Sequence, residues 1–365
     1  MKKNTKQKAI IYLGGSYPQI QGVKAIKKAG LIVILIDQNH SAPCANHADI
    51  HLKFSVTDVQ SIINYFKVQS GILNIVGIYG ISDYTNKTIM KLNKYFRLET
   101  GIPSLSNLSN KIKTHKLLEK TNVLKPKLLW SGNSAPDAVY LKKKMSGFKK
   151  IVVKPSSSYS SKGIRVLDTQ NISNIIKSIE FALEFSNFAL VEEFIKGEIV
   201  NIDGLKLDKE VYYFSLIRRG SGKINENLNY IFGLKFLEIE KKLKNKALVM
   251  TKSLLNILEY RNGPFTIDTI LSGDHFYPIE ASPHLHAVSF YKNNNQHPLN
   301  LWAKFLISGK FNELAYDHLN IGYFALKVKK RDMRVNENLL NSFLSNEFIL
   351  DYFIRPEFKV NIDRS

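Results

Sequence analysis

The sequence has 365 residues, a hydrophobic fraction of 44% and a formal net charge of +21 at pH 7. This length allows two or three domains with a substantial core, and no apolar run approaches the roughly 20 residues that cross a bilayer. Only nine of the 52 basic residues are arginine, the residue that base readout and bidentate phosphate contacts favour. We therefore favour a small anionic ligand over nucleic acid. The single cysteine, Cys44, excludes an internal disulfide and fits a reducing cytoplasm.

The first hundred residues alternate between apolar, strand-like segments and amphipathic, helix-like segments. This alternation is typical of a parallel sheet with helices on both faces. The opening MKKNTKQKAIIYLGG has too short an apolar stretch for a signal peptide and leads into the first strand. The expected strands are Ala9–Leu13, Leu31–Ile36 and Ile75–Tyr79, and the expected helices are Gln21–Ala29, Val59–Phe66 and Thr85–Tyr95.

A turn-rich segment, GIPSLSN at residues 101–107, marks a boundary, and helices and antiparallel strands are mixed after it. Residues 311–365 carry no chemical signal. The expected helices are 110–120, Ile172–Phe185 and Lys242–Leu258. The expected strands are Lys127–Trp130, Phe188–Val191, Glu198–Leu205 and Glu210–Arg218, followed by a hairpin of Pro264–Leu271 and Phe276–Glu280.

The segment Ile151–Leu167, IVVKPSSSYSSKGIRVL, is the most informative part of the sequence. A strand ends in Lys154, a loop of small hydroxyl residues follows, and a second strand begins after Lys162 and Gly163. Small side chains let backbone N–H groups approach an anion, and the lysine adds a positive charge beside it. The spacing is not that of a P-loop. By itself the segment fits a phosphate-binding hairpin and a solvated loop about equally well.

Other residues that suit nucleotide chemistry occur on both sides of this hairpin. Lys111 lies early on a predicted helix, and two lysines from different elements can bind adjacent phosphates. Glu192 ends a strand whose backbone amides can contact an adenine edge. Asp268 and Glu280 lie on the paired strands of the later hairpin, where two carboxylates can hold Mg²⁺. Together these residues make a complete site for Mg·ATP.

In this order the motifs resemble the ATP-grasp superfamily, which includes carbamoyl phosphate synthetase, biotin carboxylase, and carboxylases and transformylases of purine biosynthesis. The resemblance runs from about Ile10 to about Ser282. LGGSYPQIQGVKAIKKAGLIVILIDQNHSAPCANHAD resembles a pre-ATP-grasp domain, and NKIKTHKLLEKTNVLKPK resembles the helix that opens the grasp fold.

The resemblance implies a fold that combines α/β and α+β parts. A Rossmann-like, parallel-sheet pre-ATP-grasp domain at 1–106 would precede a two-subdomain ATP-grasp fold. Its N-terminal part at 107–190 would include a mobile lid at about 126–188, and its C-terminal part at 191–310 would hold the metal-binding hairpin. A C-terminal extension would follow at 311–365.

The resemblance also implies roles for particular residues. Lys111 and Lys154 would contact the phosphates, Glu198 would lie near the ribose, and Ser156–Ser161 would close over the triphosphate. The implied nucleotide-binding residues are Lys111, Lys154, Ser156, Ser157, Ser158, Glu192, Glu193, Phe194, Ile195 and Glu198. The implied metal ligands are Asp268, Glu280 and Ser282, and the implied catalytic residues are Lys154, Arg218 and His284.

The activity implied by the resemblance is that of an ATP-dependent ligase. It would join a small-molecule carboxylate to an amine or another nucleophile through an acyl phosphate, and it would convert Mg·ATP to ADP and phosphate. A cytoplasmic location and a possible homodimer go with this expectation. The sequence departs from the family where Glu-x-Asn-Pro-Arg usually ends the metal hairpin, because Ser282 and His284 stand at the Asn and Arg positions. A module of the same fold that binds ATP or a metabolite without turnover therefore remains an alternative.

Three other patterns have competing interpretations. Gly14, Gly15 and Asp37 suggest a dinucleotide fold, but the G-x-G-x-x-G spacing is absent. His284 and His286 could bind a transition metal, although we favour contacts with substrate, as for Arg218 and Arg219. Zinc-like spacing also occurs in a segment that we interpret as a polar surface connection, at His40, Cys44, His47 and His51.

Overall fold

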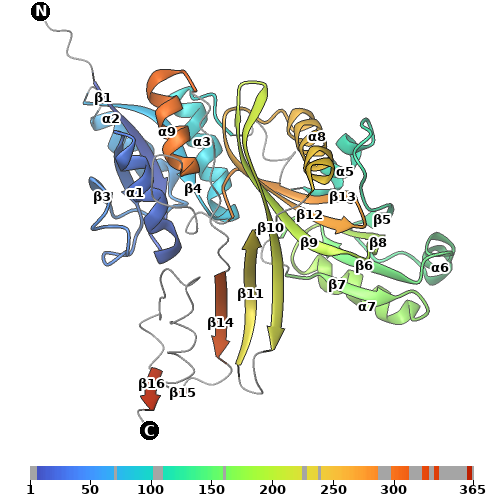
Figure 1. Ribbon diagram of the computed structural model, residues 1–365. Coiled ribbons are helices and arrows are strands. Elements are labelled where there is room, and N and C mark those ends of the chain that lie inside the picture. The colour runs from blue at the N-terminus through green and yellow to red at the C-terminus, as the bar shows by residue number, and fades with distance from the viewer. Residues whose placement is uncertain are drawn as a thin grey trace, which may run out of the picture.

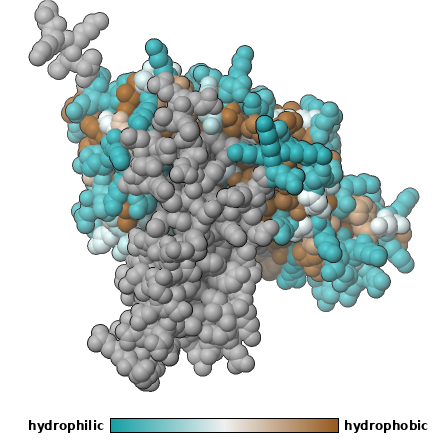
Figure 2. Space-filling view, in the orientation of Figure 1, coloured by the Kyte–Doolittle hydropathy of each residue, from teal (hydrophilic) through white to brown (hydrophobic). Residues whose placement is uncertain are grey.

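The computed structural model describes residues 6–69, 72–101, 110–158, 162–223, 228–236, 240–286, 297–311, 323–328, 333–336 and 360–363. As predicted, the chain combines a parallel sheet with antiparallel sheets (Figure 1). Hydrophilic side chains cover much of the described face in Figure 2, with apolar residues scattered between them. No helix among these residues has the length and apolar character needed to cross a membrane.

The first sheet is parallel, with the order β3-β2-β1-β4. Its strands are buried on both faces, because helices cover each side. Helices α1 (Ile20–Lys28) and α9 (Pro298–Ser308) pack on one face, and α2 (Val59–Val68) and α3 (Asn86–Phe96) pack on the other. The strands are β1 (Gln7–Leu13), β2 (Ile32–Ile36), β3 (Ile50–Leu52) and β4 (Leu73–Gly80).

A four-stranded antiparallel sheet with the order β5-β8-β6-β7 follows in the chain. Helices α6 (Ala138–Lys144) and α7 (Ile172–Leu183) bury one face of this sheet. Helix α5 (Lys111–Leu118) precedes it. The strands are β5 (Leu128–Gly132), β6 (Lys150–Pro155), β7 (Arg165–Asp168) and β8 (Ala189–Glu193).

The largest sheet has six antiparallel strands in the order β13-β12-β9-β10-β11-β14. Helix α8 (Lys241–Ile257) packs on one face, where every second residue of the central strands is apolar and buried. The strands are β9 (Glu198–Leu207), β10 (Glu210–Lys223), β11 (Leu228–Phe236), β12 (Gly263–Ser272), β13 (His275–Ser282) and β14 (Tyr323–Val328).

Several elements were not predicted from the sequence. Strands β3 and β11 and helices α6 and α9 carry no pattern that we assigned. Helix α9 comes from the far end of the chain and joins the first sheet, where the Asn300 side chain donates to the Ala25 carbonyl at 2.9 Å. Of residues 311–365, the structure describes Phe311 and the strands β14, β15 (Met333–Asn336) and β16 (Val360–Asp363).

Candidate active site

Helix α5 presents Lys111 and His115 on one face. The helix begins at Lys111 because the Asn110 side chain accepts hydrogen bonds from the backbone N–H groups of Ile112 and Lys113, each at 3.1 Å. Residues four positions apart share a helix face, so Lys111 and His115 point the same way. Both side chains are buried.

Lys154 and Glu192 form a buried ion pair on the sheet made by β5–β8. On β6, Ile151 and Val153 pack into the core of that sheet, so Lys154 points to the opposite face. Its Nζ lies 2.5 Å from Glu192 Oε2. His115 contacts the other carboxylate oxygen, Oε1, through its Nε2 atom.

Lys154 and His115 determine the state of the Glu192 carboxyl. Burial alone would raise its pKa, but the charges and hydrogen bonds of Lys154 and His115 outweigh that effect and hold the pKa of Glu192 below its ordinary value. The carboxylate is therefore ionised at neutral pH and satisfied at both oxygens.

The start of the small-residue loop is connected to α5. The Ser156 carbonyl accepts from the Lys111 N–H at 2.9 Å, and the Ser158 carbonyl accepts from Lys111 Nζ at 3.4 Å. Ser156 Oγ also lies 2.9 Å from Ser186 Oγ. Ser157 is partly buried, and residues 159–161 of the expected lid lie outside the described residues. The loop therefore leaves β6 directly beside both lysines.

The carboxylates lie on the six-stranded sheet, in a row that crosses three strands. Asn201 on β9 pairs in register with Asp268 on β12, and Asp268 pairs with Glu280 on β13. Side chains of such cross-strand partners share a face, which here is the face opposite α8. Asn201 Nδ2 donates to Asp268 Oδ1, and Lys111 Nζ lies 3.9 Å from Glu280 Oε1. Lys111 thus joins the acidic row to the lysine side.

A second polar row lies beside the first, nearer to the parallel sheet. Asp203, Thr266 and Ser282 are aligned on the same three strands, and all are buried. Past Ser282 the chain reaches His284, which is 7% exposed, and the backbone N–H of Leu285 donates to Tyr79 Oη at 3.2 Å. Ser282 and His284 therefore lie between the carboxylates and the end of β4.

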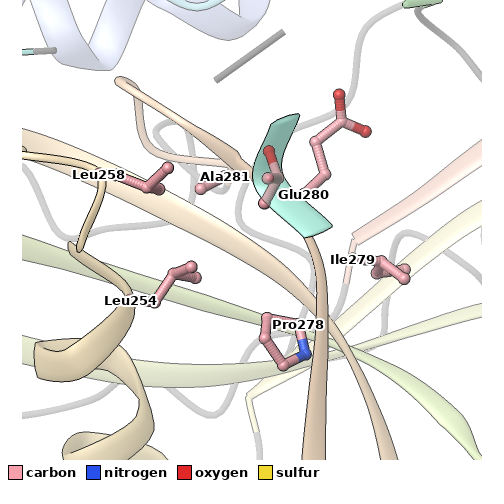
Figure 3. A pocket seen from close by; sticks show the side chains of 7 residues that line it. Leu254, Leu258, Pro278, Ile279, Glu280 and Ala281 are labelled. Atoms are coloured by element: carbon pink, nitrogen blue, oxygen red, sulfur yellow. The ribbon is translucent and has the colours of Figure 1, made fainter. Parts of the chain in front are cut away.

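A β-bulge shapes the space between the two sides of the site. Asp268 pairs with Glu280 but Thr269 pairs with Pro278, so Ile279 is the extra residue. Ile279 and Pro278 line a hollow together with Lys111, Lys125 and Lys154. A second, apolar hollow adjoins it beneath α8, and the Glu280 carboxylate points away from Leu254 and Pro278 there (Figure 3).

The structure brings together six of the residues predicted for the site. They are joined by the contacts described above: Lys111, Lys154, Ser156, Ser158, Glu192 and Glu280. Asp268 lies next to Glu280 in the row. All of these roles remain predictions, but their proximity is what a shared ligand site requires.

Five other predicted residues lie on strands β8, β9 and β10 or just after β8. Glu193 points to the opposite side of β8, where its Oε2 accepts from the Lys127 N–H at 3.3 Å. Phe194 and Ile195 follow β8 and are partly buried. Glu198 begins β9 and is exposed. Arg218 lies on β10 opposite Val200, and its side chain lies outside the described part of the structure.

Sequence reasoning missed three residues that the structure places in the site. His115 lies one helical turn after Lys111, and that spacing could have indicated it. Asn201 and Asp203 interrupt an otherwise apolar strand with a period of two, VNIDGL, which is the pattern of a polar face on a central strand.

The glycine turn after β1 does not offer its N–H groups to a phosphate. Gly14 N donates to the Ile36 carbonyl at 2.9 Å, Gly15 N to Asp37 Oδ2 at 2.7 Å, and Ser16 N to Gln19 Oε1 at 2.8 Å. Asp37 therefore fixes the turn, and a dinucleotide would find no backbone donors there.

The zinc-like segment is held by other interactions. Cys44 is buried, its Sγ donates to the Ser16 carbonyl at 3.4 Å, and burial and Asp37 raise the pKa of its thiol to about 12. His51 Nε2 lies 2.9 Å from the Asp37 carbonyl. In the described residues, no group of three or more His, Cys, Asp or Glu side chains could hold a metal ion.

The acidic row fits Mg²⁺ bound together with a nucleotide. Its donors are all oxygens, the type that Mg²⁺ prefers. The buried Oδ1 atom of Asn201 has no hydrogen-bond partner among the described residues, so one further oxygen in the row remains unsatisfied. Two carboxylates and phosphate oxygens would complete the coordination.

Comparisons with known proteins agree with this architecture. Residues 108–288 match the sequence profile of the ATP-grasp domain, and no curated protein sequence matches the chain. Biotin carboxylase from Campylobacter jejuni is 14% identical with a TM-score of 0.63, over 85% of this chain and 72% of that chain. N5-carboxyaminoimidazole ribonucleotide synthetase from Thermotoga maritima is 17% identical with a TM-score of 0.62, over 87% and 79%. L-amino acid ligase from Bacillus licheniformis is 15% identical with a TM-score of 0.61, over 83% and 75%. At these identities the structures share the fold.

Proposed function

The chain contains an ATP-grasp domain, and from this premise we propose that it is an ATP-dependent ligase that activates a carboxylate as an acyl phosphate. The observation that carries the proposal is the convergence of Lys111, Lys154 and Glu280 beside one hollow. Lys111, Lys125 and Lys154 line that hollow with one carboxylate, that of Glu192, and the Glu280 carboxylate lies beside Lys111. Such an excess of positive charge suits a polyphosphate.

Each side of the hollow has a role in binding Mg·ATP. Lys111 and Lys154 neutralise the phosphate oxygens, and Ile279 and Pro278 provide an apolar wall for the base. Asp268 and Glu280 hold Mg²⁺, and Asn201 orients Asp268. When bound, the ion neutralises charge on the phosphate oxygens as phosphoryl transfer proceeds.

The reaction needs positioning and charge neutralisation more than a protein nucleophile. A carboxylate oxygen of the substrate attacks the γ-phosphorus, and the bond to the bridging oxygen breaks to release ADP. An amine, or another nucleophile, then attacks the acyl carbon and displaces phosphate. The acceptor lies near Ser282 and His284, where the end of β13 meets the parallel sheet. A carbon–nitrogen bond and a homodimer are further parts of the proposal.

The test is release of ADP and phosphate from Mg·ATP against a panel of carboxylates, each with and without amines. ADP that forms only with one carboxylate–amine pair would establish the ligase and identify its substrates. Lys154→Met and Glu280→Gln should abolish the release, whereas Lys142→Met, an exposed lysine on α6, should not. Full activity in the Lys154 and Glu280 variants would contradict the proposal.

A nucleotide-binding module without turnover is the second candidate. Ser282 favours it, because a serine hydroxyl is a poorer Mg²⁺ ligand than the amide oxygen of the usual asparagine. Tight binding of ATP with no ADP formed in any substrate mixture would establish this alternative.

A further inference from the structure

We propose that His115 is a positioning residue that holds Glu192 in place while Lys154 turns from Glu192 to the phosphates of the nucleotide. Lys154, Glu192 and His115 then form a latch that opens when a polyphosphate arrives. The inference rests on the proposed ATP site, and it concerns how Lys154 becomes available within that site.

The two oxygens of the Glu192 carboxylate have different partners. Oε2 contacts Lys154 Nζ at 2.5 Å, and Oε1 contacts His115 Nε2. The three groups come from β8, β6 and α5, and each side chain is more than 90% buried. Lys154 is therefore paired with a carboxylate that lines the same hollow.

A buried carboxylate cannot lose its only cationic partner without a large cost. If Lys154 were the only partner of Glu192, its move to a phosphate would leave a buried, unpaired carboxylate. The energy of phosphate binding would then have to offset the cost of that unpaired charge. The hydrogen bond from His115 removes that condition, because Glu192 keeps one buried donor when Lys154 leaves. The lysine can then exchange one anionic partner for another.

The position of His115 links this exchange to the rest of the site. The His115 carbonyl accepts from Lys125 Nζ at 3.3 Å, and Lys111 lies one turn earlier on the same helix. The Lys111 N–H binds the Ser156 carbonyl, two residues after Lys154. The helix that anchors Glu192 is therefore also the helix that holds the phosphate loop.

The latch also assigns Glu192 a different role from the one that the sequence implied. With both oxygens engaged, Glu192 acts on the lysine and not on the adenine edge. The binding of phosphate-bearing ligands should therefore depend on His115, whereas the binding of adenosine should not.

The experiment measures binding by calorimetry, with a non-hydrolysable ATP analogue and with adenosine. His115→Leu removes the donor at similar volume, His115→Gln keeps an N–H donor, and Lys116→Gln changes an exposed neighbour on the same helix as a control. We expect the leucine variant to bind the analogue about tenfold more weakly and adenosine unchanged. The glutamine and control variants should stay within about threefold of the wild type.

Three results would overturn the latch: unchanged analogue binding in His115→Leu, an equal loss with adenosine, or no rescue by glutamine. A wild-type protein that binds no analogue would overturn the proposed ATP site and the latch with it. If the leucine variant does not fold, ¹⁵N NMR of the wild-type histidine rings provides the second measurement. The Nε2 proton of His115 should stay hydrogen-bonded when the analogue saturates the protein, and its release would contradict the proposal.

Discussion

Glu192 shows how one buried carboxylate organises residues that lie far apart in the chain. Its partners are 38 and 77 positions away (192 minus 154, and 192 minus 115), yet all three side chains meet and are more than nine-tenths buried. At such depth an unpaired charge costs several kcal/mol. Removing either partner therefore affects stability as well as ligand binding.

We predict that Glu192→Gln lowers the free energy of unfolding by about 3 kcal/mol at neutral pH, because Lys154 is left as an uncompensated buried charge. The pKa of Glu192 is lowered in the folded protein, so its stabilising contribution is full above the unfolded value of 4.5 and is lost as the pH falls through the folded pKa. Urea unfolding at several pH values tests this. The difference in unfolding free energy between the wild type and Glu192→Gln should shrink as the pH falls through the folded pKa of Glu192. The double variant with Lys154→Met should be less destabilised than Glu192→Gln alone.

Asn201 gives a second prediction at this scale. Asn201→Leu removes the amide that donates to Asp268 Oδ1 and keeps a side chain of similar volume at this fully buried position. We expect it to lose the orientation of Asp268 and to bind Mn²⁺, with the ATP analogue present, at least tenfold more weakly. Electron paramagnetic resonance of Mn²⁺ measures the affinity. Ser282→Ala is the matched comparison, and a larger loss in that variant would make the serine the more important residue.

The residues predicted from the sequence are those whose chemistry is common at ATP sites, such as the lysines and the hairpin carboxylates, and their roles stay predictions. The sequence did not predict Asn201 or His115. Their importance depends on which side chains lie across the sheet or one helical turn away, and this is determined by register and packing and not by residue type.

At the scale of elements, the start of α5 positions most of the site. Asn110 fixes the first turn, and Lys111 is the first helical residue. The cap therefore controls where the Lys111 ammonium lies between Ser158 and Glu280.

We predict that Asn110→Ala destabilises the protein by about 1 kcal/mol and also weakens binding of the ATP analogue several-fold. Asn171→Ala removes the corresponding cap of α7, where Asn171 accepts from the Asn174 N–H at 3.0 Å. That control should lose similar stability and keep its affinity. Equal affinities in both variants would show that the α5 cap has only a structural role.

Element prediction worked best where periodicity was strong. Strands β1, β2 and β4 of the parallel sheet and the hairpin β12–β13 were located to within a residue or two. Helix α9 was missed, although it packs against the first sheet, because its LNLWAKFLIS segment is apolar on nearly all sides and gives no amphipathic pattern. Strand β11 was missed because its apolar alternation is interrupted by Gly233.

At the scale of the molecule, the parallel sheet and the six-stranded sheet meet near Tyr79. This phenol is buried between Tyr12 and Trp302, with ring centroids 5.3 Å and 6.0 Å away. Burial raises the pKa of Tyr79 far above its ordinary value, so its hydroxyl remains neutral and accepts the Leu285 N–H. The contact fixes the end of β13, where the acceptor is expected, against the end of β4.

We predict that Tyr79→Phe costs about 1–3 kcal/mol, since the buried Leu285 N–H loses its acceptor. Amide exchange at Leu285 should accelerate, while exchange in the α8-covered core should change only in proportion to global stability. The contacts between sheets could not be predicted from the sequence, because Tyr79 and Leu285 are 206 positions apart and share no motif. Unchanged exchange at Leu285 would contradict this role for Tyr79.

The carboxylate side and the lysine side of the site differ in the sequence separation of the residues that form them. Asp268 and Glu280 lie on one hairpin that turns at Gly273 and Asp274, whereas Lys111 and Glu280 are 169 positions apart (280 minus 111). Short loops close faster and at lower entropic cost than long ones. We therefore expect the carboxylate pair to assemble early in folding and the lysines to reach it late. The affinity for polyphosphate would then be acquired only at the last step, so a nascent chain would not bind nucleotide before its sheets have docked.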